Sequence, residues 1–450
     1  MRILTNHWND SFYEQLSKWQ HVLNNFPARL TGSVGHQDFI NWLKDEIYNM
    51  EYDAIIETHY FNYWEPESYE LRIDNKPIEV SGYFPYSGLT VQEGITKEAV
   101  FYMPDTEQNF QDKIAIFDIY LLQDGKSALF KDAIAHPLLA SKKAISLLKK
   151  IKELGAAGAV FIWEEMSQKL SRNEVLPFSN PYLDIPAVWI SSRSKPQLIH
   201  ELSKNNLLTL ILTGKYKVKS PTESFFVKIE GRKSKPVKES ILVTTHTDGP
   251  NAIEENGPIA LLLILYYLKV NDIQLPETII FAFISGHFQQ EQIGGPRNKA
   301  TGRWLESFPE LWDGEGNHLK AVFSLTLEHL GCLSAYDNKE LKFVETETPE
   351  TNYIYYSDSQ QKYMIKRIIE KSKTKDKIMY LDAQLTPYFG EGMPIFKHGI
   401  PNVSIISMPQ FLFQPTYNYV KPDLDLMYEQ IRYSTEILFS FSNFDSNEIP

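Results

Sequence analysis

The chain has 450 residues, which is too long for one compact core and predicts two domains or one domain with a large insertion. Its hydrophobic content of 43% and charged content of 23% are typical of globular proteins and argue against extensive disorder. The net charge of -12 argues against nucleic acid or an anionic membrane as a partner.

The cysteine count, the first residues and the longest apolar run bear on the cellular compartment. Cys332 is the sole cysteine, so no intramolecular disulfide can form, which fits a reducing environment. The first residues, MRILTNHWND, lack the apolar segment of a signal peptide. The longest apolar run, IALLLILYYL at 259–268, is only half of a bilayer span. We therefore expect a soluble, cytoplasmic protein.

In chain order, the first predicted elements are a helix and a strand: FINWLKDEIYNM (39–50) has helical apolar spacing, and ETHYFNYW (57–64) alternates as strands do. Between about residues 85 and 235, short apolar runs recur as AVFYM, KIAIFDI, GAVFIW, IPAVWIS and LTLILTG. A predicted helix at 140–158 among them ends on glycines. This pattern of short apolar runs predicts a small β-rich domain, with SKPVKES (234–240) as the linker that follows it.

The last part of the chain contains longer apolar runs, which alternate with helical segments. They are ILVTTH (241–246), IALLLILYYLKV (259–270), ETIIFAFIS (277–285), AVFSLTLEHL (321–330) and IPNVSIIS (400–407). Such a pattern predicts a mainly parallel sheet covered by helices on both faces. We assign the chain to the α/β class, with residues 1–85 and 235–450 forming the sheet domain and 86–234 inserted between them.

Polar residues follow the predicted strands of the sheet domain. His246 ends one strand, His287 and Glu328 follow two others, and Glu391 lies in the loop before a fourth. In parallel sheets, ligands bind beyond the carboxyl ends of the strands, so we expect these side chains to meet. Imidazole and carboxylate groups from separate loops are the ligands that hard or borderline divalent metals prefer.

The same region carries several motifs in a fixed order. They are NFPARLTGSVGHQDFINWLKDEI (25–47), VTTHTDG, EENGPIALLLIL, LTLEHLG and IFKHGIP. In this order, the motifs resemble those of the co-catalytic zinc aminopeptidases and glutamate carboxypeptidases of clan MH. The strands and helix of the predicted insertion follow the order of a protease-associated domain, so the resemblance covers nearly the whole chain.

The resemblance implies roles for individual residues. His246 matches the first zinc ligand, and Asp248 matches the carboxylate that orients that histidine. Glu255, or as a second choice Glu254, stands where the family has a bridging aspartate, and Glu328 matches an acidic ligand. The cofactor implied is zinc, as one ion or as two that share a carboxylate. Members of the family often form dimers, so the resemblance leaves a homodimer open.

One departure from the family concerns its Glu-Glu pair, in which the first Glu is the general base and the second is a zinc ligand. Without a gap, the pair falls on His287 and Phe288, and with a three-residue slip it falls on Gln290–Glu291. Neither alignment restores two glutamates. His287 has an unperturbed pKa suited to accepting a proton, but it could also be a ligand or a packed histidine.

A second departure concerns the last histidine ligand. By count it falls on Gly392, beside Glu391, and His398 is too close to the following glycine to match. We therefore consider Glu391 as a substitute ligand. We interpret His329 as structural, because strand alternation turns it away from Glu328.

Two functions fit these observations. The first is a zinc-dependent hydrolase with an altered ligand set, acting on a peptide or small amide. The second is a catalytically degenerate protein on a peptidase fold that binds a peptide, a small molecule or a partner protein. The substituted positions remain capable of binding a metal, which favours the hydrolase. Glu254 and Glu255 also suit a helix N-terminus, whose dipole attracts negative charge, and this does not exclude the metal role.

Overall fold

A computed structural model describes residues 8–120, 137–172, 175, 182–232, 238–293, 299–415 and 421–442. The strands are β1 Ala54–Ile73, β2 Lys76–Ile78, β3 Gly82–Tyr83, β4 Ile95–Phe101, β5 Ile114–Tyr120, β6 Gly158–Glu164, β7 Ala187–Ser191, β8 Leu207–Ile229, β9 Glu239–His246, β10 Thr278–Ile284, β11 Lys320–Leu327, β12 Leu333–Asp337, β13 Phe343–Pro349, β14 Thr351–Tyr356, β15 Lys377–Asp382 and β16 Asn402–Ser407. The helices are α1 Asp10–Asn25, α2 Val34–Asn49, α4 Pro137–Glu153, α5 Gln168–Ser171, α6 Lys195–Leu202, α7 Gly257–Val270, α8 Gln290–Ile293, α9 Lys299–Ser307, α10 Ser359–Ser372, α11 Gly392–Lys397 and α12 Leu424–Ser440, with short 3-10 turns η2 His287–Gln289 and η3 Pro309–Leu311.

Within the described ranges, fourteen strands form one sheet in the order β15-β14-β16-β11-β9-β10-β8-β4-β5-β6-β7-β3, with β1 beside β8 and β2 beside β1. β9 is parallel to both of its neighbours, β10 and β11, and β11 is parallel to β16. β14 runs antiparallel to β16, and β8 runs antiparallel to β10. The predicted fold class, a mixed and mostly parallel sheet with helices, is confirmed.

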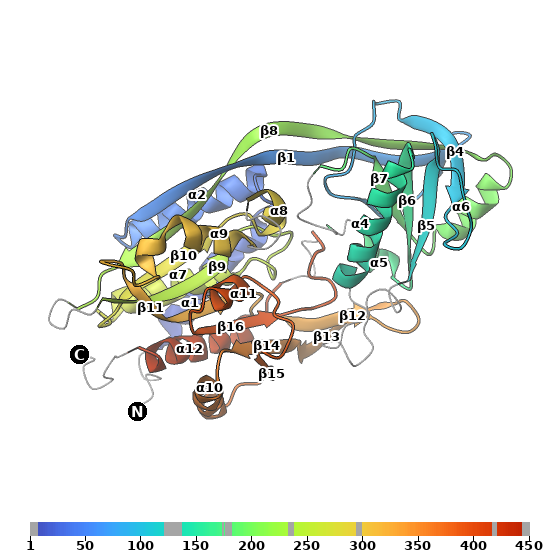
Figure 1. The fold of residues 1–450 in the computed structure, drawn as a ribbon. Coiled ribbons are helices and arrows are strands. Elements are labelled where there is room, and N and C mark those ends of the chain that lie inside the picture. Colours follow the sequence, from blue (N-terminus) through green and yellow to red (C-terminus); the bar gives the residue numbers. More distant parts are fainter. Residues whose placement is uncertain are drawn as a thin grey trace.

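Two long strands connect the parts of the molecule. β1 and β8 pair antiparallel over most of their lengths, from Ala54 opposite Val227 to Arg72 opposite Thr209. Figure 1 shows them as ribbons along the top of the view, reaching from the helices around β9 to the part built from β4, β5, β6 and β7. Both parts therefore share these strands. The assignment of residues 86–234 to a separate inserted domain stays a prediction.

Helices cover both faces of the sheet around β9. On one face, α1, α2, α7 and α12 pack together over a core that includes Val243 of β9 and Phe281 of β10. On the other face, α9 and α11 pack over Leu242 and Ile280 of the same strands. Because both faces of the sheet are covered, every residue of ILVTTH is buried, and burial does not alternate along the strand.

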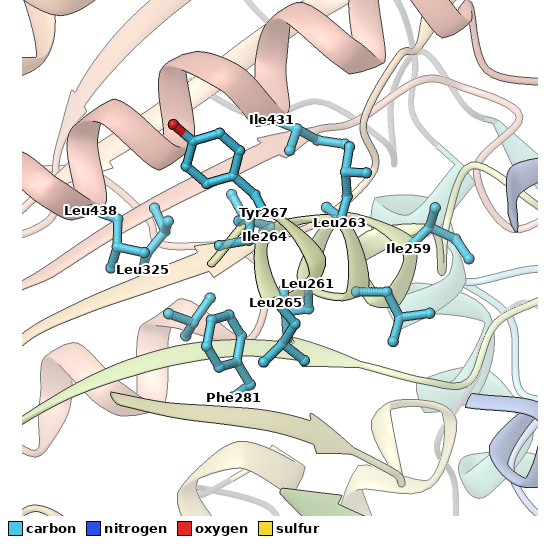
Figure 2. Close-up of a cluster of buried hydrophobic side chains, with 14 of the residues drawn as sticks. Ile259, Leu261, Leu263, Ile264, Leu265, Tyr267, Phe281, Leu325, Ile431 and Leu438 are labelled. Atoms are coloured by element: carbon cyan, nitrogen blue, oxygen red, sulfur yellow. The ribbon is translucent and has the colours of Figure 1, made fainter. Parts of the chain in front are cut away.

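Helix α7 lies deepest, between the sheet and α12. All residues from Gly257 to Leu265 are buried. In Figure 2, Leu263 lies toward Ile431 of α12, while Leu265 lies toward Phe281 of β10. The helix is therefore apolar on all sides, as a helix enclosed on all sides must be. Its N-terminus directly follows Glu254 and Glu255, so its packing fixes the position of these carboxylates.

The predicted local elements are found with shifted ends. The helix predicted from residue 39 begins at Val34, because the Ser33 side chain accepts the His36 backbone N–H and caps it. The helix predicted to reach 158 ends at Glu153, and Gly155 follows with φ +79, the left-handed conformation that closes helices.

The strand predicted at 57–64 is a part of the longer β1. Of the predicted linker at 234–240, residues 234–237 lie outside the described residues, and Glu239 and Ser240 belong to β9. No helix in the described part of the chain has both the length and the apolar character needed to cross a bilayer.

Leu263→Ala tests how far the fold depends on α7. Leu263 is fully buried, so the truncation should lower the free energy of unfolding by about 2–5 kcal/mol through lost burial and the cavity left behind. Val270→Ala on the same helix is the control, because Val270 is 54% exposed and its truncation should change the free energy by less than about 0.5 kcal/mol. Urea unfolding measures both, and equal effects would contradict the buried position of α7.

Candidate metal centre

Three neighbouring parallel strands end at one edge of the sheet and carry polar residues there. His246 is the last residue of β9, His287 follows β10, and Glu328 and His329 follow β11. Glu254 precedes α7 in the loop after β9. All five side chains are buried, with His287 the most exposed at 6%. The structure therefore brings residues from separate loops together at this edge.

Two of the histidines are held by backbone carbonyls. Nδ1 of His246 donates to the Asp248 carbonyl oxygen at 2.9 Å, and Nδ1 of His329 donates to the Ser407 carbonyl oxygen at 2.6 Å. Each Nε2 then carries the lone pair, and neither has a hydrogen-bond partner among the described residues. Fixing Nδ1 in this way sets the tautomer that a metal-binding imidazole needs.

The third histidine pairs with a carboxylate. Nδ1 of His287 lies 2.6 Å from Oε1 of Glu391, and the His287 ring stacks on His246 with 4.2 Å between centroids. Oε2 of Glu391 accepts the backbone N–H of Thr301, in the first turn of α9, at 3.1 Å. Burial alone would raise the pKa of Glu391, but the hydrogen bond with His287, with Lys299 nearby, lowers it below its usual value. Glu391 is therefore an ionised partner of His287.

Glu254 stands at the centre of the histidines. Its Oε1 lies 3.8 Å from Nε2 of His246, 3.6 Å from Nε2 of His287 and 3.8 Å from Nε2 of His329. These separations are too long for hydrogen bonds. They are close to the spacing of about 3.4 Å between donor atoms on a tetrahedral zinc ion with bonds of 2.0–2.1 Å. Neither carboxylate oxygen of Glu254 has a hydrogen-bond partner among the described residues.

Glu328 completes the cluster. Its Oε2 lies 3.5 Å from Nε2 of His246, and its Oε1 accepts the backbone N–H of Glu391 at 2.9 Å. Gly390 packs against it so closely that a Cβ would come within 2.4 Å of Oε1. Two groups of ligand atoms within 4.8 Å of one another result: His246, Glu328 and His329, and His246, Glu254 and His287.

Burial shifts the pKa of these groups in the directions expected of charges placed away from water. It raises the pKa of Glu254 well above its usual value, helped by Asp248, and it raises the pKa of Glu328 to about 7. It lowers the pKa of His246 well below its usual value and that of His329 to about 3. His246 and His329 are thus neutral at pH 7, which is the form that binds a metal. Arg29 opposes the effect of burial on Glu254, and Lys299 opposes it on Glu328, but the pKa of both carboxyl groups remains raised.

Glu255, the preferred candidate for the bridging ligand, has a different partner. Its Oε1 accepts hydrogen bonds from Nε and Nη2 of Arg29, and both side chains are buried. Arg29 and Gly249 also exchange backbone hydrogen bonds, which hold the loop against the entry segment. The geometry therefore favours Glu254, the second choice of the sequence analysis, as the carboxylate of the cluster.

Asp248 supports the centre in another way than expected. Its carbonyl oxygen, and not its carboxylate, holds His246. The carboxylate accepts backbone N–H groups of Gly286, His287 and Phe288 at 2.9–3.2 Å and the hydroxyl of Thr31. Asp248 therefore fixes the loop after β10, which carries His287, as well as the ring of His246.

His329 is the residue that the sequence analysis missed. Alternation along a strand would turn it away from Glu328, but its φ of +56 is left-handed and ends the strand pattern. Both side chains consequently face the same cluster. The adjacent pair Glu-His at a strand end was the available signal, although nothing in the sequence predicts the backbone reversal.

The remaining candidates lie elsewhere. His398 follows α11, with Nδ1 2.8 Å from the Pro394 carbonyl oxygen, and it belongs to neither ligand group. Gly392 starts α11 beside Glu391. The side chains of Gln290 and Glu291, the alternative positions for the Glu-Glu pair, lie outside the described part of the chain.

The segment around Leu412 and Gln414, which follows β16, contacts the loop that carries Glu254. Nδ2 of Asn251 donates to the carbonyl oxygens of Leu412 and Gln414 at 2.7 and 3.0 Å. Nε2 of Gln414 in turn donates to the carbonyl oxygens of Leu170 and Arg172, at the end of α5. These bonds tie the loop after β9 to the part of the molecule built from β4–β7, and they help to explain the deep burial of the cluster.

No protein-family model and no curated protein sequence matches this chain. Solved structures do match its fold over nearly the whole length. A zinc aminopeptidase from Bacillus subtilis is 14% identical, with 97% of each chain covered and a TM-score of 0.66. An aminopeptidase from an Aneurinibacillus species is 12% identical, with 97% of this chain and 96% of that chain covered and a TM-score of 0.65. A peptidase precursor from Shewanella amazonensis is 13% identical, with 98% and 95% covered and a TM-score of 0.66. At these identities the likeness shows the fold, which is that of the zinc aminopeptidases.

Arg29→Met tests the role of the buried ion pair. The change leaves the Glu255 carboxylate buried without its cation, so the free energy of unfolding should fall by about 3–5 kcal/mol. The double variant Arg29→Met/Glu255→Gln should recover much of this loss. Arg72→Met is the control, because the Arg72–Glu70 pair is exposed and should contribute less than about 1 kcal/mol. A loss in Arg29→Met no larger than in the control would refute the assignment.

Proposed function

We propose that this protein is a metal-dependent hydrolase that holds one zinc-class ion and acts on a peptide or small amide bond. The observation that carries the proposal is the set of buried donor atoms at one edge of the sheet. Nε2 of His246 and His329 and the free oxygens of Glu254 and Glu328 converge without hydrogen-bond partners among the described residues. Such a concentration of unpaired polar atoms is expensive unless a cation binds there.

The ion is best assigned to His246, Glu328 and His329, with Glu254 beside them. Both groups of ligand atoms contain Nε2 of His246, and a neutral imidazole nitrogen has one lone pair to give. Among the described residues, a second ion would find Glu254 and His287 as its remaining ligands, because Glu391 is engaged with His287 and Thr301. The arrangement therefore supports a mononuclear centre, in contrast to the two ions that the family resemblance allows.

When bound, a zinc ion with three protein ligands would act as a Lewis acid and lower the pKa of water to near 7. The proton that a hydrolytic step releases needs an acceptor. His287 fits this task, because its Nε2 lies beside Glu254 and the ionised Glu391 carboxylate would stabilise the imidazolium formed. Asp248, through the backbone of the loop after β10, keeps the His287 ring next to that of His246.

The substrate class rests on the fold. The Bacillus subtilis structure is a zinc aminopeptidase and the Aneurinibacillus structure an aminopeptidase. A peptide or small amide is accordingly the first substrate to test, by analogy of fold.

A second candidate function is favoured by the depth of the cluster. All of its side chains are at most 6% exposed, and a closed, fully buried metal site is typical of structural metal centres. In that case the protein would bind a peptide, a small molecule or a partner protein on a peptidase fold without hydrolysing it. Metal content and hydrolysis, measured separately, distinguish the two functions.

His329→Gln tests the metal assignment. Protein purified without chelators should contain about one zinc-class ion per chain by elemental analysis, since the two ligand groups share His246. Both His246→Gln and His329→Gln should lose the ion on dialysis. His200→Gln is the control, because His200 is exposed on α6, far from the ligand groups in sequence. Two ions per chain, or full retention in His329→Gln, would contradict the mononuclear assignment.

His287→Gln separates the proton acceptor from the ligands. If His287 accepts the proton, hydrolysis of a mixed peptide library should fall by about 10²–10⁴-fold while the metal content stays at the wild-type value. Loss of metal in this variant would instead make His287 a ligand. A wild-type protein that carries metal but cleaves no peptide would favour the binding function.

A further inference from the structure

A small cavity lies where the entry segment, β1 and the loop after β10 meet. Its volume is about 190 Å³, and its lining includes Tyr63, Trp64 and Glu65 of β1, together with Tyr83, Tyr86 and Phe288. Ligand pockets for whole small molecules usually measure about 300–1,000 Å³. This cavity is therefore of a size to receive one amino-acid side chain.

The cavity shares a wall with the candidate metal centre. Phe288 lines it, and the preceding residue is His287, whose ring lies 5.5 Å from that of Phe288. Thr31 also lines it and donates its hydroxyl hydrogen to the Asp248 carboxylate. Asp248 accepts the Phe288 backbone N–H at 2.9 Å as well. A side chain in the cavity would consequently bring its own backbone near the loops that carry the cluster.

Aromatic rings dominate the walls. The Trp64 ring lies 5.6 Å from that of Tyr83 and 5.8 Å from that of Tyr86, in tilted arrangements that leave no stacked pair among them. The π-faces of such rings carry partial negative charge and attract cations. They also provide an apolar surface for a hydrocarbon stem.

Glu65 is the sole charged side chain among the lining residues of this cavity, and it is exposed at the protein surface. Lys215 of β8 lies opposite Glu65 in the strand pair, but its ion pair, at 2.8 Å, is with Glu67. The hydroxyl of Tyr63, which also lines the cavity, donates a hydrogen bond to Glu65 and so turns the carboxylate toward the aromatic wall. An aromatic cavity with one carboxylate, on a chain with net charge -12, is complementary to a ligand with an apolar stem and a positive end.

The geometry points to a specificity subsite that takes one lysine- or arginine-class side chain of a bound peptide. The stem would lie between the rings of Trp64, Tyr83 and Tyr86, and the cation would lie near Glu65. This subsite would select the substrate of the proposed hydrolase, and its role in substrate selection rests on that proposed function.

The test compares arginine with citrulline, a neutral side chain of nearly the same shape. Tripeptides that carry either residue at the first or second position are titrated into His287→Gln protein by calorimetry, so that turnover does not interfere. At either the first or the second position of the peptide, arginine should give binding about 10-fold tighter than citrulline, the magnitude expected of a cation over aromatic rings. Norleucine in place of arginine should bind like citrulline.

Two further variants assign the difference to the cavity. Glu65→Gln and Tyr83→Leu should each reduce the arginine preference, whereas Glu70→Gln, on the same strand but outside the cavity and paired with Arg72, should preserve it. Glu65 is exposed, so Glu65→Gln tests the idea even if Tyr83→Leu does not fold. Equal binding of arginine and citrulline peptides, or a preference unchanged in both variants, would overturn the proposal. A preserved preference together with absent hydrolysis in the wild type would overturn the proposed function alone.

Discussion

Parallel pairing of β9 with β10 on one side and β11 on the other is the constraint on which the candidate centre depends. Parallel neighbours end at the same edge, so the residues after each strand are brought together without any long connection across the sheet. His246, His287 and Glu328 come from three such ends. The burial of α7 fixes Glu254 against them, because the loop between His246 and the helix has little freedom once both ends are packed.

The electrostatics of the cluster follow from its burial. Placing several ionisable groups away from water is unfavourable unless each has a partner of opposite charge or a hydrogen bond. Two acidic groups of the region meet this condition within the protein: Glu255 pairs with Arg29, and Glu391 pairs with His287. Neither oxygen of Glu254 has a hydrogen-bond partner among the described residues, and Glu328 has one on a single oxygen, from the Glu391 backbone N–H. Burial raises the pKa of both carboxyl groups. The metal ion that we propose would stabilise both carboxylates in their ionised form.

The substitutions in the cluster also explain how the site differs from the ligand set that the motif resemblance implies. In the ungapped alignment, His287 takes the place of the family's glutamate base, and Oε1 of Glu391 lies 2.6 Å from its Nδ1. His329 adds a donor beside Glu328. In the proposed function, the His287–Glu391 pair would supply the proton acceptor in place of that glutamate. This is the physical basis for expecting one ion here, with His287 acting next to it.

The sequence by itself determined the fold class and the order of the strands along the chain, because both follow from the local periodicity of apolar residues. It also placed His246, His287, Glu328 and Glu391 at strand or loop ends on one edge, because parallel strands end together. Tertiary structure alone decided which of two adjacent glutamates enters the cluster. Arg29 lies 226 residues before Glu255, and no local pattern links them. It also decided the role of His329, whose left-handed backbone reverses the alternation expected after β11. Contacts between distant segments set these choices, because the free energy of a buried charge depends on every group around it and not on its neighbours in the chain.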